Sequence, residues 1–155
     1  MFNVEVISTT YKRNYGALKS FLEGISDEDS RMNPQPAGNN INWVVGHIVH
    51  YRSIILELLA QDPIWEKEAN ATLYGFDSQP LPDGAGYSLD DLMSHLDTSQ
   101  DTLLQTLAAW EDTQLDTPLS DGNATIGQRL DFFAWHEGYH LGQIALLKRV
   151  IGQGK

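Results

Sequence analysis

The stretch from residue 126 to residue 152 reads IGQRLDFFAWHEGYHLGQIALLKRVIG, and it decides the fold. Its apolar side chains recur every three or four residues over about seven turns, which predicts a long amphipathic helix packed against a core. Thr125 is the expected N-cap, and Gly152 is the expected end of this helix. His136 and His140 stand four positions apart inside the apolar stripe, so we expect their rings to lie one above the other on the same face.

Three other segments share this periodicity, and we expect helices from about residue 3 to 24, from 41 to 60 and from 88 to 110. Asn40 caps the second helix, and Ser88 caps the third. The connection over residues 62–87 is long, contains several prolines and glycines, and includes a short candidate helix from Trp65 to Tyr74. No segment is typical of a strand. The sequence therefore predicts an all-α, single-domain four-helix bundle over residues 1–155, with a long connection between helices two and three.

Charge and composition narrow the range of partners. The chain has 10 Lys and Arg residues against 21 Asp and Glu residues, a formal net charge of −11. Such a surface repels phosphate backbones and anionic lipids, so we expect neither nucleic acid nor a membrane as partner. The sequence has no cysteine, which excludes disulfides, Cys-ligated zinc and a cysteine nucleophile. It also opens without the apolar core of a signal peptide, and we expect a cytoplasmic protein.

Three of the five histidines fall on apolar helix faces. His47 lies in the stripe of the second helix, between Trp43 and Tyr51. A lone buried histidine is usually a core residue with a satisfied hydrogen bond, but one divalent cation can satisfy three imidazoles together. We therefore predict that His47, His136 and His140 are metal ligands. Imidazole donors accept zinc, nickel, iron or manganese, and the ligand type alone does not choose among them.

The remaining two histidines, His50 and His95, lie to the side of these faces, and we expect them at the surface or beside the ligands. Gly138 and Gly142 fall opposite the metal-facing histidines on the fourth helix. Small residues there allow another helix to approach closely. That helix belongs either to the bundle itself or to the second subunit of a homodimer.

The five residues HEGYH, 136–140, also satisfy the H-E-x-x-H pattern of zinc proteases, in which the glutamate is the general base. The extended protease pattern has a third histidine six positions later, where this chain has Leu146. No His, Asp or Glu follows His140, so the third ligand has to come from upstream, which disfavours a protease. Two interpretations of Glu137 stay open. It is a helix-surface carboxylate, which we favour slightly, or it acts at the metal site, as a hydrogen-bond acceptor for a ligand or a proton acceptor near metal-bound water.

Tyr51 and Glu137 are the candidate catalytic side chains. Tyr51 lies one turn from His47 on the same face, and Glu137 is next to the first ligand of the fourth helix. Arg52 points away from His47 on the helical wheel, and we leave it out of the expected site.

Two segments, GNNINWVVGHIVHYRSIIL at residues 38–56 and the fourth-helix stretch at 126–152, resemble the DinB-like (YfiT-like) superfamily. The similarity rests on an N-W-x-x-x-H run followed much later by H-x-x-x-H-x-G-Q. The resemblance implies a four-helix bundle of metal-dependent enzymes, with His47, His136 and His140 as ligands. Some members of that superfamily look like transferases or isomerases that activate a low-molecular-weight thiol, such as bacillithiol or mycothiol, at the metal.

We therefore expect a metal-dependent enzyme that activates a thiol or water toward a small-molecule substrate, in the manner of an S-transferase or a hydrolase. The absence of cysteine fits a thiol supplied by a cosubstrate. A non-catalytic, stress-related bundle that binds metal for stability or sensing is the alternative. A scaffold whose histidines only pack is the third hypothesis.

Overall fold

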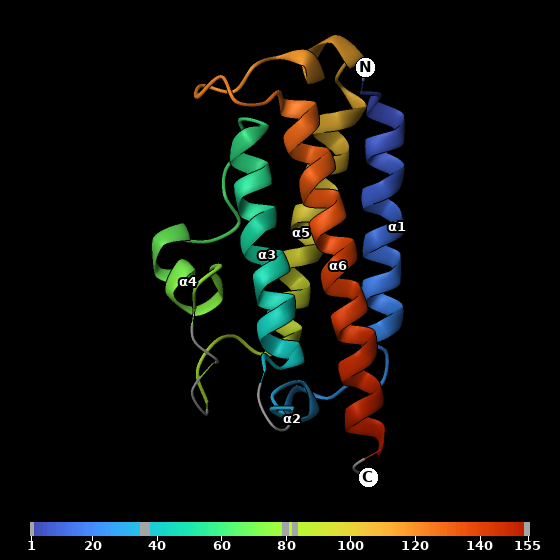
Figure 1. Ribbon diagram of the computed structural model, residues 1–155, viewed down its shortest axis with the longest axis vertical. Helices are drawn as coiled ribbons and strands as arrows, with labels where there is room; N and C mark the ends of the chain where they lie inside the picture. The colour runs from blue at the N-terminus through green and yellow to red at the C-terminus, as the bar shows by residue number, and fades with distance from the viewer. Residues whose placement is uncertain (1, 35–37, 79–80, 82–83, 154–155) are drawn as a thin grey trace.

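Four long helices run along the length of the molecule: α1 (Val4–Leu22), α3 (Ile41–Leu58), α5 (Leu89–Ala108) and α6 (Ile126–Gln153) (Figure 1). The connections contain the short helices α2 (Asp27–Ser30) and α4 (Lys67–Tyr74) and the 3-10 helix η1 (Asp112–Asp116). The computed structural model describes residues 2–34, 38–78, 81 and 84–153. Among these residues no strand forms beyond an isolated bridge between Pro118 and Thr125, and the all-α prediction is confirmed.

Side-chain caps explain where the long helices begin. The Asn40 side chain accepts a hydrogen bond from the Trp43 N–H at 2.9 Å, and Ser88 Oγ accepts one from the Asp91 N–H at 3.1 Å. Both caps are those predicted from the sequence. The short helix expected between Trp65 and Tyr74 is present as α4. Two features differ from the prediction: the short helix α2 forms between the first two predicted helices, and α6 continues past Gly152.

The directions of the helices explain the long connection. In Figure 1, α1 and α6 run one way and α3 and α5 run the other way, with α3 and α5 in contact. Two consecutive parallel helices need a crossover, because the chain has to return to the end from which the first one started. The connection that contains α4 makes this return on the outside of α3 (Figure 1). The predicted long connection between helices two and three is confirmed.

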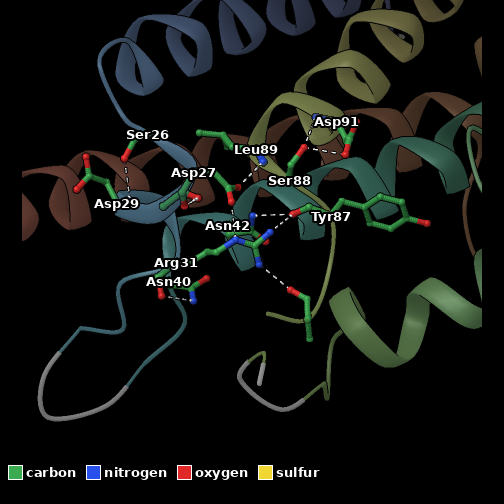
Figure 2. Close-up of polar contacts among 12 residues, drawn as sticks. Ser26, Asp27, Asp29, Arg31, Asn40, Asn42, Tyr87, Ser88, Leu89 and Asp91 are labelled. Atoms are coloured by element: carbon green, nitrogen blue, oxygen red, sulfur yellow. Dashed lines mark hydrogen bonds and ion pairs between the residues drawn. The ribbon is translucent and has the colours of Figure 1, made fainter. Parts of the chain in front are cut away.

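Figure 2 shows how the starts of α3 and α5 are held together at the end of this crossover. Arg31, next to α2, donates from Nη2 to the Tyr87 carbonyl at 2.8 Å, and Asn42 donates to the same oxygen at 3.0 Å. Asp27 Oδ1 accepts from the N–H of Leu89, the first residue of α5, at 2.8 Å. Asp27 thus pairs a backbone N–H that has no partner within the first turn of α5, and Arg31 and Asn42 hold the carbonyl just before its cap.

The core consists of two apolar clusters, one at each end of the bundle. On each long helix, polar side chains lie between the residues of the two clusters. These buried or half-buried residues, called the polar layer below, are Asn14, Arg52, Ser99, Gln100 and Glu137. No helix in the described part of the chain is both long and apolar enough to cross a membrane.

Candidate metal centre

Three histidines from two helices converge halfway along the bundle. His47 comes from α3, and His136 and His140 come from α6, which packs against α3. The three possible ligand nitrogens all lie within 4.8 Å of one another. Nε2 of His136 is 3.4 Å from Nε2 of His47 and 3.0 Å from Nε2 of His140. Two ligand nitrogens of a tetrahedral zinc ion are separated by about 3.3 Å, so these spacings suit one shared ion. The predicted convergence of the three side chains is confirmed.

Hydrogen bonds on the far side of two rings orient them toward this centre. His47 Nδ1 is 2.6 Å from the carbonyl oxygen of Tyr74, and His140 Nδ1 is 2.7 Å from Oε1 of Gln143. Because these oxygens can only accept, each Nδ1 carries the proton and each Nε2 directs its lone pair inward. Metal-binding histidines usually have this kind of outer partner, which fixes the tautomer and the ring orientation.

The three inward-facing Nε2 atoms cannot all hydrogen-bond to one another, because too few of them carry a proton. Nε2 of His47 and Nε2 of His140 are both acceptors, and a single proton on Nε2 of His136 can be donated to only one of them. Adding a second proton to one of these rings is costly, since burial lowers the pKa of His47 to about 3 and that of His136 to about 4. Burial also lowers the pKa of His140. The three imidazoles are therefore neutral at pH 7, the form that binds metal ions, and a divalent cation would satisfy all three.

Aromatic rings enclose the histidines. Trp43 stacks on His47 with ring centroids 4.6 Å apart, and Tyr51 meets His47 and His136 edge-on at 4.8 Å each. Trp43 Nε1 donates to Ser78 Oγ at 2.8 Å, which attaches the segment after α4 to the rim of the centre. Tyr51, a candidate from the sequence, thus contacts two of the three imidazoles. Burial, and to a lesser extent Asp77, raises the pKa of Tyr51, so its hydroxyl is protonated at pH 7.

Glu137 lies in the core rather than on the helix surface, so that interpretation of it is wrong. Its side chain is 3% exposed, and that of its partner Arg52 is 1% exposed. Arg52 Nε donates to one carboxylate oxygen, and Nη2 donates to the other at 3.1 Å. A surface position was expected because the prediction places the centre of the apolar face of α6 at His140. The buried residues Leu130 and Ile144 show that the centre lies about 60° away, at Glu137.

Arg52 points away from His47, as expected, but it points into the protein. Its guanidinium lies 4.6 Å from the ring centroid of Tyr11, a cation–π contact. Burial raises the pKa of Glu137, and the charge and hydrogen bonds of Arg52 oppose this rise. In an H-E-x-x-H protease the glutamate has to face the metal. Here both carboxylate oxygens are bound by Arg52, so the geometry supports a structural ion pair for Glu137.

Comparison with known proteins now adds to this geometry. The profile of the DinB superfamily matches residues 10–144, which include all three histidines of the centre. The chain belongs to the DinB superfamily. The resemblance seen in the sequence is thereby confirmed. No curated protein matches the chain.

A solved structure shares the fold of this DinB-superfamily chain. It is described as the conserved protein of a locus from Enterococcus faecalis, and it superposes with a TM-score of 0.74. The two sequences are 19% identical, and the alignment covers 100% of this chain and 99% of the other. At this identity the likeness supports the fold alone.

The other two histidines of this DinB-superfamily chain lie outside the candidate metal centre. His50 is buried, and both His50 and His95 contact Trp65, with centroids 6.4 and 5.6 Å apart. Trp65 also stacks on Tyr74 and Tyr87 at 5.7 and 5.3 Å. The two histidines thus belong to a separate aromatic cluster that packs the α4 connection onto the bundle. His50 is more buried than its position on the helical wheel indicates.

Proposed function

We propose that this protein is a divalent-metal-dependent enzyme in which His47, His136 and His140 hold the ion. It would activate a thiol or water for attack on a small electrophilic substrate, as an S-transferase or a hydrolase does. The observation that carries this proposal is the pair of outer hydrogen bonds, from His47 to Tyr74 and from His140 to Gln143, which direct two lone pairs at one point. Membership of the DinB superfamily supports it.

A three-histidine site is suited to catalysis as well as to binding. Structural zinc sites use four protein ligands, whereas three ligands leave a position open for a reactant. When bound, a divalent ion lowers the pKa of a coordinated thiol or water and so supplies a nucleophile at neutral pH. Because the chain has no cysteine, the thiol would be a low-molecular-weight cosubstrate such as bacillithiol or mycothiol. Zinc, nickel, iron and manganese are all compatible with the donors.

The residues of the chain around the ligands have distinct roles in this proposal. Tyr51 keeps its phenolic proton and could donate a hydrogen bond to the leaving group or the carbonyl oxygen of the substrate. Trp43 stacks on His47, Phe132 stacks on His136, and each covers one face of the imidazole from bulk water. The acidic chain, at −11, would act on small molecules in the cytoplasm rather than on nucleic acid or membranes.

The deciding experiment is elemental analysis of the purified protein and of two variants. His140→Ala should lose the metal, whereas the matched control His95→Ala, outside the centre, should retain it. Equal metal content in wild type and His140→Ala would refute the site. Thiol-transfer and hydrolysis assays with and without chelator then test catalysis. Metal-dependent stability without turnover of any thiol or hydrolytic substrate would favour the non-catalytic alternative.

A further inference from the structure

The outward face of α6 is apolar although nothing in the described chain covers it. Five large side chains on this face are between 46% and 65% exposed: Phe132, Trp135, Tyr139, Leu146 and Val150. Gly138 and Gly142 lie among them, and a Cβ added at either glycine would meet no atom within 4 Å. The idea that these glycines pack tightly within the bundle is therefore wrong. We call this surface the outer α6 face.

The size of the outer α6 face suits a protein partner. With about 150–250 Å² for a large side chain, these exposed fractions leave roughly 500 Å² of apolar surface. The largest apolar patch on a typical monomer is roughly 300–600 Å², so this face is at the upper end. A stable interface buries about 800 Å² on each partner. The apolar side chains supply more than half of that area, and their polar neighbours can supply the rest.

The charges at the two ends of the face indicate which partner fits. Asp131 and Arg149 are both exposed, and they are 18 residues apart, which is five helical turns, so they lie on the same flank of α6. If two α6 helices cross antiparallel near residue 140, Asp131 of each copy meets Arg149 of the partner subunit. A parallel pairing would instead bring like charges together. The remaining surface of this chain, with its net charge of −11, is self-repelling.

We propose that a second copy of this chain covers the outer α6 face and forms a two-fold symmetric, antiparallel homodimer. Gly138 and Gly142 stand two positions either side of residue 140, so they meet at the crossing point and let the helix backbones approach closely. Trp135 and Leu146 of the partner subunit then lie at similar heights along the helix pair, and their side chains interdigitate.

This interface also adjoins the metal centre. Phe132 stacks on His136 with centroids 6.1 Å apart, and Tyr139 contacts His140 at 5.1 Å. The partner subunit would therefore cover the outer wall of the site. The dimer is nevertheless inferred from the face and its charges alone, and it stands whether or not the metal proposal does.

The test is the mass of the purified protein in solution by light scattering and sedimentation velocity, over a range of concentrations. Wild type should have about twice the 17.3 kDa of one chain. Trp135→Glu and Gly142→Leu should each raise the dimer dissociation constant at least about tenfold, because the two-fold axis places each change in the interface twice. Phe76→Glu is the matched control, since Phe76 is 79% exposed but follows α4. Circular dichroism confirms that each variant is folded.

The antiparallel arrangement has its own test. Asp131→Arg and Arg149→Asp should each weaken the dimer about tenfold, and the double variant should restore it, since the exchanged charges again oppose each other. A double variant as weak as the single ones would overturn the antiparallel pairing. A wild-type mass of 17.3 kDa at every concentration would overturn the homodimer. This holds also if the monomer binds a different protein through the outer α6 face. A dimer unaffected by Trp135→Glu would also overturn this proposal.

Discussion

Arg52 of α3 binds both carboxylate oxygens of Glu137 of α6, and almost no solvent reaches either side chain. This ion pair joins the two helices that carry the three histidines. Glu137 directly follows His136, one of the three histidines, and the pair is buried in the polar layer between the two apolar clusters. A buried charge without its partner is strongly destabilising, which leads to the first prediction.

Glu137→Gln should reduce the free energy of unfolding by about 3–5 kcal/mol, because it leaves the Arg52 guanidinium buried without a counter-charge. Urea denaturation measures this change. Glu57→Gln is the matched control, since Glu57 pairs with Lys67 at 2.8 Å on the surface and its loss should cost less than about 1 kcal/mol. The double variant Arg52→Met with Glu137→Leu should be more stable than Glu137→Gln. Equal losses in the buried and the surface variants would contradict the structural role of the pair.

Gln143→Leu should weaken metal binding about 10- to 100-fold while leaving the fold intact. The substitution removes the acceptor that holds the Nδ1–H of His140 at 2.7 Å, so the ring loses its fixed tautomer and orientation. Competition with a chromophoric chelator measures the affinity. Gln105→Leu, at an exposed position of α5, changes the same residue type away from the centre and should bind like wild type. If both variants bind equally well, the outer hydrogen bond does not orient the ligand.

The metal-free protein should lose stability as the pH falls below about 6.5. The pKa of His47 is lowered to about 3 by burial, so the unfolded chain takes up a proton at this residue while the folded chain does not. The contribution of neutral His47 to the free energy of unfolding is thus fully present above pH 6.5, and it is lost as the pH falls toward 3. Between pH 6 and 5 this one proton contributes about 1.4 kcal/mol per pH unit at most. In His47→Gln, the slope of the free energy of unfolding against pH should be shallower by up to that amount. Urea denaturation in the presence of chelator measures it. Parallel slopes would mean that His47 titrates normally.

Adding zinc or nickel to chelator-treated protein should raise the Tm. A ligand at 100 times its Kd stabilises the folded state by about 2.7 kcal/mol, if it does not bind the unfolded chain. The increase should disappear in His136→Ala, which lacks the central nitrogen of the three, and should persist in His50→Ala. Differential scanning calorimetry at fixed metal concentration measures it. A rise of similar size in His136→Ala would place the ion elsewhere.

The parts of the fold that the sequence predicts are those governed by local chemistry. Asn40 and Ser88 cap helices because their side chains bond to backbone groups three residues away, and this requires no knowledge of the rest of the chain. The meeting of His136 and His140 likewise follows from helical periodicity alone. His47 joins them because it lies on the apolar face of another helix, and a small bundle has only one interior.

Glu137 shows where such reasoning fails. The apolar stripe of a helix locates the core only if the opposite side is polar. On α6 the opposite side carries Trp135 and Tyr139, so the pattern does not distinguish the inner side from the outer one. Arg52 was missed for a related reason: α3 is buried on almost every side, so pointing away from His47 does not mean pointing to solvent. Both errors arise from tertiary packing rather than from local preference.

The polar layer also determines how α6 can slide along its neighbours. A shift by one helical turn, about 5.4 Å, would move Glu137 into an apolar cluster and leave Arg52 without a partner. The same shift would leave at most one of His136 and His140 beside His47, because these two residues are themselves about one turn apart on α6. A bundle with a wholly apolar interior would tolerate such slipped alignments more easily. The buried charges therefore select a single helix register, and it is the register in which three imidazoles meet.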